Sequence, residues 1–139
     1  MEGAVRLSLA ALAVLAMAVG ATIVVMGPDA TARGLSALLG GRSAYRGGLD
    51  HVNAGSELRF YAVAWIAWGG VLIRMLRDLD RYRGAILVML ALLFAGGMAR
   101  LLGLLFDGPP DLLFQLLMWG ALFGPVILGA LLMRVPQRA

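Results

Sequence analysis

Residues 7–26 form a run of twenty residues without a charged side chain. At the helical rise of about 1.5 Å per residue, such a run spans roughly 30 Å, which is the thickness of the hydrocarbon core of a bilayer. A basic residue followed by an apolar run also describes a secretory signal peptide, but this run is longer than a usual signal-peptide core. The sequence therefore predicts an uncleaved membrane-spanning helix at the start of the chain.

Three further apolar segments follow, at residues 58–76, 84–106 and 112–133. Each is long enough to cross a bilayer, provided that the arginines near the ends of 58–76 extend toward the headgroups. With 61% hydrophobic and 14% charged residues, the chain has little material for a separate soluble module. We therefore expect an all-α polytopic membrane protein, a single domain over residues 1–139 in which four transmembrane helices form a bundle.

The segment between the first two spans, residues 27–57, is unusually long for a plain connector in a compact domain. It is rich in glycine but contains an apolar patch at residues 35–39. This combination predicts an interfacial helix or a functional loop.

The arginines indicate how the bundle lies in the membrane, because loops that carry more basic residues stay in the cytoplasm. All twelve basic residues are arginine, and the net charge is +4. Seven of them fall on the side of the two termini, namely Arg6, Arg74, Arg77, Arg81, Arg83, Arg134 and Arg138. Three fall in the first loop, namely Arg33, Arg42 and Arg46. We expect both termini in the cytoplasm, the long first loop outside, and a multi-pass protein of the bacterial plasma (inner) membrane. Membrane lipids are the expected partners, and nucleic acid is not expected.

Two arginines, Arg59 and Arg100, lie near the ends of the second and third predicted spans that are away from the short basic turn at residues 74–83, and at almost equal distances from that turn. If the two helices are antiparallel, both guanidinium groups reach the same depth in the outer half of the bilayer. An arginine in this region costs roughly 2.5 to 3.5 kcal/mol on insertion scales, so it requires a counter-charge, water or an anion. Glu57 is the nearest acid, and Asp107 lies about 10 Å above Arg100 along its helix.

These four residues, Glu57, Arg59, Arg100 and Asp107, form the candidate site, and three interpretations of it remain open. They can form a structural charge network that clamps two helices. They can bind the anionic group of a lipid or amphiphile, because two arginines against Glu57 leave an excess positive charge. The arginines can also extend to the headgroups without a specific partner.

Small residues recur at spacings that let helices approach closely in lipid. They are Ala95, Ala99 and Gly103 on the third span and Gly120 and Gly124 on the fourth. These faces predict helix packing, either inside the bundle or against another integral membrane protein or a second copy of the chain.

Three short motifs carry a family resemblance. They are Ser56-Glu57-Leu58-Arg59-Phe60-Tyr61, Gly97-Met98-Ala99-Arg100-Leu101 and Asp107-Gly108-Pro109. With them the chain resembles small four-helix bacterial membrane proteins grouped as domain of unknown function family 4345. The resemblance implies a four-helix fold and names no activity. The family pattern often places an acid just before a Gly-Pro pair in the fourth helix, whereas the residues before Gly124-Pro125 contain none.

The sequence lacks the combinations on which most enzyme mechanisms depend. There is no cysteine, the single histidine, His51, lies in the first loop, and no nucleophile has an evident base. We therefore expect a non-catalytic protein without a cofactor or metal, acting as an accessory or assembly subunit of a larger membrane complex through lateral helix packing. The alternative is a binder of an anionic lipid or amphiphile at the outer-leaflet arginines.

Overall fold

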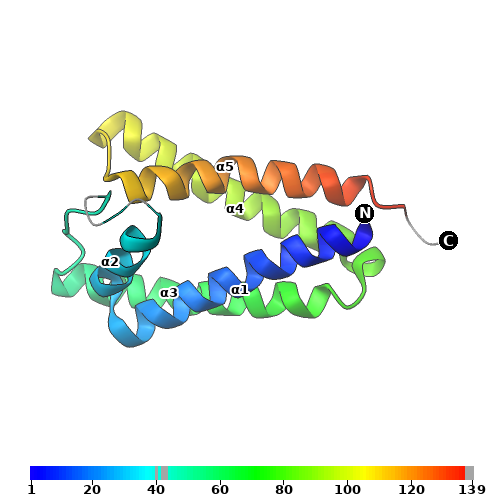
Figure 1. Ribbon diagram of the computed structural model, residues 1–139, viewed down its shortest axis with the longest axis horizontal. Coiled ribbons are helices and arrows are strands. Elements are labelled where there is room, and N and C mark those ends of the chain that lie inside the picture. The colour runs from blue at the N-terminus through cyan, green and yellow to red at the C-terminus, as the bar shows by residue number, and fades with distance from the viewer. Residues whose placement is uncertain (40, 42–43, 137–139) are drawn as a thin grey trace.

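The computed structural model describes residues 1–39, 41 and 44–136. In these residues the chain forms five α-helices and no strand: α1 (Glu2–Met26), α2 (Pro28–Leu39), α3 (Val52–Met75), α4 (Leu79–Asp107) and α5 (Leu112–Met133) (Figure 1). All except α2 are long and apolar enough to cross a membrane. The prediction of an all-α bundle with four membrane-spanning helices is therefore confirmed, and the protein is a helical membrane protein. Arg42 and Arg138, two of the arginines from which the membrane orientation is predicted, lie outside the described residues.

The helix boundaries differ from the expected ones where polar side chains extend a helix beyond its apolar run. α1 begins at Glu2, whose carboxylate pairs with Arg6 one turn later at 2.9 Å. α3 begins at Val52, because His51 acts as its N-cap and accepts a hydrogen bond from the Asn53 backbone N–H at its ring nitrogen Nδ1. At the start of α4, Asp78 caps the helix in the same way. The long first loop contains α2.

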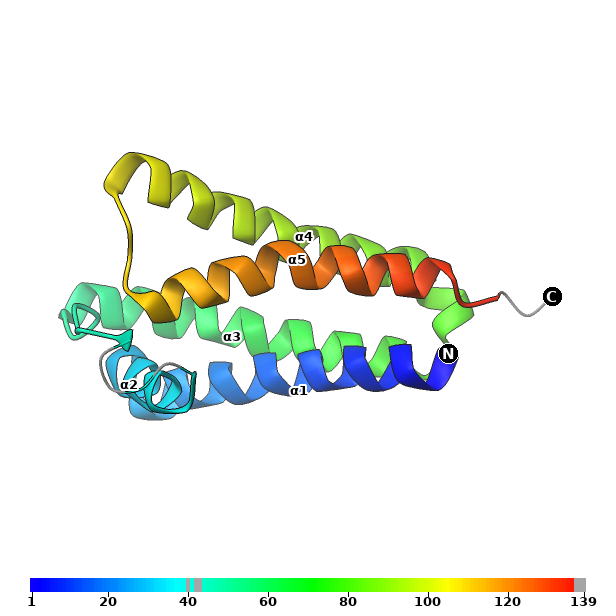
Figure 2. The same cartoon turned by 45° about the horizontal axis from the view of Figure 1, so that its top comes forward.

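The four spans form two antiparallel pairs, α1 with α3 and α4 with α5 (Figures 1 and 2). Two glycines allow the backbones of α1 and α3 to touch. A Cβ added at Gly69 would lie 2.6 Å from the backbone oxygen of Ala13, and one added at Gly20 would lie 2.8 Å from that of Ala62. A side chain fits at either position only if α1 and α3 move apart, so glycine allows the observed close packing.

α4 and α5 approach each other closely at Gly97, where an added Cβ would lie 3.0 Å from the backbone carbon of Ala121. The neighbouring Gly96 faces open space. α5 runs without interruption through Pro125, which is buried. The loss of one backbone hydrogen bond therefore leaves the helix continuous in this bundle.

The two pairs join at the end of the bundle that holds the N-terminus and the α3–α4 turn, here called the terminal end. At this end Arg83 links α4 to the end of α5. Its guanidinium donates hydrogen bonds to the backbone oxygens of Leu132 (3.1 Å) and Val135 (2.8 Å). The buried core here consists of Val5, Leu9, Ala13, Leu72, Leu76, Leu79, Ile86, Met89, Leu90, Leu132 and Val135. Toward the opposite end, α4 diverges from α3, as Figure 2 shows.

That opposite end is covered by α2 and residues 44–50, here called the α2 cap. Tyr45 packs with Ala32 and Leu113 and meets Phe114 edge to face, so the cap rests on the first turns of α5. The backbone N–H of Arg46 donates to a carboxylate oxygen of Asp111 at 2.8 Å. Because the cap is fastened to α5, the adjacent end of α4 is left with an open side.

Candidate functional site

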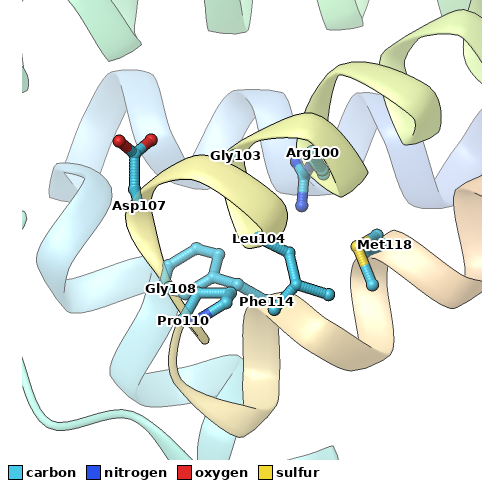
Figure 3. Close-up of a pocket in the computed structure, with 8 residues that line it drawn as sticks. All are labelled: Arg100, Gly103, Leu104, Asp107, Gly108, Pro110, Phe114 and Met118. Carbon is cyan, nitrogen blue, oxygen red and sulfur yellow. The ribbon is translucent and has the colours of Figure 1, made fainter.

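A cavity of about 270 Å³ lies on this open side, between the last turns of α4 and the first turns of α5 (Figure 3). Its lining residues are Arg100, Gly103, Leu104, Asp107, Gly108, Pro110, Phe114 and Met118. Gln115 holds the turn beside it by donating a hydrogen bond from Nε2 to the Pro110 backbone oxygen at 2.8 Å. The cavity walls are mostly apolar, and they contain one cationic and one anionic side chain.

Arg100 is the cationic group, and its side chain turns from α4 toward α5, on the side where Leu104 and Met118 lie (Figure 3). Among the residues that the structure describes, none forms a hydrogen bond or ion pair with its guanidinium. The guanidinium carries five N–H donors and a permanent charge. An arginine so placed in a membrane-spanning helix lacks the partners that normally offset its desolvation.

Asp107 lines the same cavity but does not neutralise Arg100. Its carboxylate turns away from Arg100 in Figure 3 and lies back along α4, with Oδ2 3.9 Å from the position of an added Cβ at Gly103. Arg100 also precedes Asp107 by seven residues, or about 10 Å of helix. The structure thus brings these two predicted site residues to one cavity without joining them in an ion pair.

Arg59 and Glu57 do not line this cavity. Arg59 extends toward the end of α1, where its Nε donates a long hydrogen bond of 3.4 Å to the backbone oxygen of Val24. The guanidinium lies against Gly27, which has a φ of 92° and would place an added Cβ 3.1 Å from Nη2. A cation at this position also lies beside the negative C-terminal end of the α1 helix dipole, which is a favourable interaction. Glu57 is exposed, and no ion pair joins it to either arginine within the described chain. A joint role of the four residues stays a prediction.

Most of the residues predicted to pack against another helix have no close neighbour in the described chain. Ala95 and Ala99 are exposed, and Gly103 lines the cavity. An added Cβ at Gly120 or Gly124 would have no heavy atom within 4 Å. The close contacts inside the chain are made instead by Gly20, Gly69 and Gly97. Packing of the predicted faces against another chain stays a prediction.

A second cavity, of about 310 Å³, lies between α3 and α4. Its lining residues are Tyr61, Ala64, Trp65, Trp68, Leu92 and Leu93. The candidate residues of the sequence analysis include none of these six. The signal that could have found this cavity is the spacing of Tyr61, Trp65 and Trp68, which places three aromatic residues on one face of α3.

The α2 cap carries a network of hydrogen-bonded polar and charged side chains outside the spans. Hydrogen bonds from Arg33 (2.7 Å) and then from the Tyr45 hydroxyl (2.7 Å) lower the pKa of Asp29. Burial, together with donation to Asp29, raises the pKa of Tyr45 to about 12. The Tyr45 oxygen also accepts a hydrogen bond from the Leu49 backbone N–H at 3.1 Å. Tyr45 therefore links the beginning of α2 to the chain that leads into α3.

No group of three or more histidine, cysteine, aspartate or glutamate residues in the described ranges is placed to hold a metal ion.

A protein-family model described as domain of unknown function (DUF4345) matches residues 4–132. The chain belongs to this DUF4345 family. No curated protein and no solved structure matches this chain. The DUF4345 match extends from the first turn of α1 to the last turn of α5 and includes the residues of both cavities, so Arg100 and its surroundings lie within the matched region.

Proposed function

We propose that this protein is a non-catalytic membrane protein that binds the anionic group of an amphiphile at Arg100. The observation that supports this most directly is the guanidinium without a partner in the described chain, on the wall of a mostly apolar cavity that is open at the outer side of α4 and α5. Binding of an anion there would offset the cost of placing an arginine in the membrane.

The chemistry of the cavity favours an amphiphile over a small soluble anion. Leu104, Phe114 and Met118 line the same cavity with apolar surface, which would favour a molecule that brings its own hydrocarbon. Arginine binds planar carboxylates and phosphates through two parallel hydrogen bonds, so either group fits. Asp107 faces away from this position and would repel the ligand less than a carboxylate directed into the cavity.

The arginine distribution supports an orientation with both termini in the cytoplasm of a bacterial cell. In that orientation the α2 cap is extracytoplasmic, and the Arg100 cavity lies in the outer leaflet of the plasma membrane. The proposed ligand then enters from the outer leaflet, beside the end of α4 that the α2 cap leaves open.

The test compares lipids and carboxylates that stay bound after purification in dodecyl maltoside, measured by native mass spectrometry. We expect Arg100→Met to lose a bound anionic species that the unmodified protein retains, and Arg100→Lys to retain part of it because the charge remains. Arg74→Met is the matched control, since Arg74 is an exposed arginine at the other end of the bundle. Circular dichroism establishes that each variant is folded. If Arg100→Met retains the same species at the same occupancy as Arg74→Met, the proposal is wrong.

A second candidate function is supported by the face of α5. Gly120 and Gly124 have open space where a neighbouring backbone would fit, and Trp119 and Phe123 stack on the same part of the helix. This supports an accessory or assembly subunit that packs laterally against another membrane helix. Gly124→Leu should leave the isolated chain folded and remove an association seen by native mass spectrometry. A folded variant whose associations all persist would exclude this role for Gly124.

A further inference from the structure

We infer that the cavity between α3 and α4 holds the hydrocarbon chain of the amphiphile whose anionic group binds Arg100. The inference rests on the proposed function and specifies its ligand: an acyl-chain carboxylate or an acyl-chain lipid with an anionic headgroup. The two cavities are then the two ends of one site.

The positions along α4 support this assignment. Leu92, Gly96, Arg100 and Gly103 fall within about 80° of one another around the helix axis, because successive residues are about 100° apart. Leu92 lines the second cavity, and Arg100 and Gly103 line the first. From Leu93 to Arg100 is about 10 Å along the axis. One face of α4 therefore carries both cavities, within the length of a medium or long acyl chain.

Gly96 lies between the two cavities on this face. An added Cβ there would have no heavy atom within 4 Å, so neither α3 nor α5 contacts α4 at this position. The next residue, Gly97, is packed against Ala121. The two adjacent glycines of α4 therefore differ in role: Gly97 contacts α5, and Gly96 leaves a free path along the helix.

The direction of the path agrees with the placement of a lipid. Arg100 is nearer the α2 cap, and the aromatic cavity is deeper in the bundle, so an acyl chain would run from the headgroup toward the middle of the bilayer. Trp65 and Trp68 meet edge to face with ring centroids 6.3 Å apart and provide an apolar wall for the chain. Two of the three tryptophans are therefore in position to report the chain by fluorescence.

The experiment measures quenching of tryptophan emission in the full-length protein in dodecyl maltoside, with Trp119→Phe so that only Trp65 and Trp68 report. The probes are palmitate brominated at mid-chain, palmitate brominated next to the carboxylate, and phosphatidylglycerol with mid-chain bromines. We expect saturable quenching that is stronger for mid-chain bromine than for bromine beside the carboxylate. Saturation by palmitate alone identifies a free carboxylate as the ligand class, and saturation by phosphatidylglycerol alone identifies a lipid phosphate.

Gly96→Leu tests the path itself, because its side chain would occupy the space over α4 without meeting the backbone of a neighbour. We expect at least a tenfold rise in the half-saturating concentration of mid-chain-brominated palmitate. Gly84→Leu is the matched control on the same helix, exposed and away from both cavities, and should match the parent protein.

The outcomes separate the two proposals. If Arg100→Met abolishes saturable quenching while Gly96→Leu behaves like Gly84→Leu, the headgroup site stands and the acyl-chain path is wrong. The path is equally overturned if bromine beside the carboxylate quenches as strongly as mid-chain bromine, a comparison that requires no variant at Gly96. If neither probe class shows saturable quenching, the acyl-chain inference is wrong, and native mass spectrometry of Arg100→Met decides the headgroup site separately. If saturable quenching is present but Arg100→Met leaves it unchanged, the proposed function fails and the inference fails with it.

Discussion

The contact between α1 and α3 gives the sharpest prediction, because two adjacent glycines of α3 differ only in what faces them. An added Cβ at Gly69 would lie 2.6 Å from the Ala13 backbone oxygen, whereas one at Gly70 would have nothing within 4 Å. We therefore expect Gly69→Ala to force the helices apart and Gly70→Ala to be accommodated in place.

The magnitude follows from the overlap. An ordinary contact between carbon and a carbonyl oxygen is about 3.3 Å or longer, so α1 and α3 must separate by about 0.7 Å at this point. Overpacking of this kind costs about 1 to 3 kcal/mol. Replacing glycine by alanine in a helix also changes intrinsic helix propensity by about 1 kcal/mol, but this contribution is the same for both variants and cancels in their comparison. The free energies of unfolding should therefore differ by about 1 to 3 kcal/mol, a factor of roughly 5 to 150 in the unfolding equilibrium.

The assay is unfolding in mixed micelles of dodecyl maltoside and sodium dodecyl sulfate, followed by circular dichroism. Gly69→Ala should unfold at a lower mole fraction of dodecyl sulfate than Gly70→Ala. On α4 the pair Gly97→Ala and Gly96→Ala should repeat the result, since only Gly97 is packed against a backbone. Equal stabilities for Gly69→Ala and Gly70→Ala would refute the argument that backbone contact determines the α1–α3 pairing.

Three further predictions concern the terminal end, the α2 cap and the orientation. Arg83→Met should lower the free energy of unfolding by about 2 to 4 kcal/mol, because it removes hydrogen bonds to two backbone oxygens. In the same micelle assay, the control Arg81→Met, which replaces an exposed arginine, should leave the free energy of unfolding close to that of the unmodified protein. Because the pKa of Tyr45 is raised to about 12 from 10.0, the stability that its neutral hydroxyl contributes is complete below pH 10 and is lost between pH 10 and about 12. Absorbance of tyrosinate at high pH should show one late-titrating tyrosine that Tyr45→Phe removes. Reporters placed after Arg138 and near Asp80 should both be cytoplasmic and one near Gly47 external; an external reading near Asp80 would contradict the arginine count.

The four spans could be predicted from the sequence because they depend on local properties. The length and apolarity of a run determine whether it crosses a bilayer, and neither requires a neighbour. The long first loop was likewise identified as too long for a plain connector, and α2 lies within it. The same local reasoning placed Arg59 and Arg100 within the spans, since helical rise converts sequence position to height.

The neighbours of those arginines were decided only by the tertiary structure. Equal distances from a turn give equal depth, but they do not say toward which helix a side chain is directed. α3 packs on α1 through Gly20 and Gly69, so Arg59 lies beside the end of α1. α4 packs on α5 through Gly97, so Arg100 lies beside a cavity that α5 completes. Helix pairing depends on where two distant backbones can approach, and that information belongs to both helices together rather than to either segment alone.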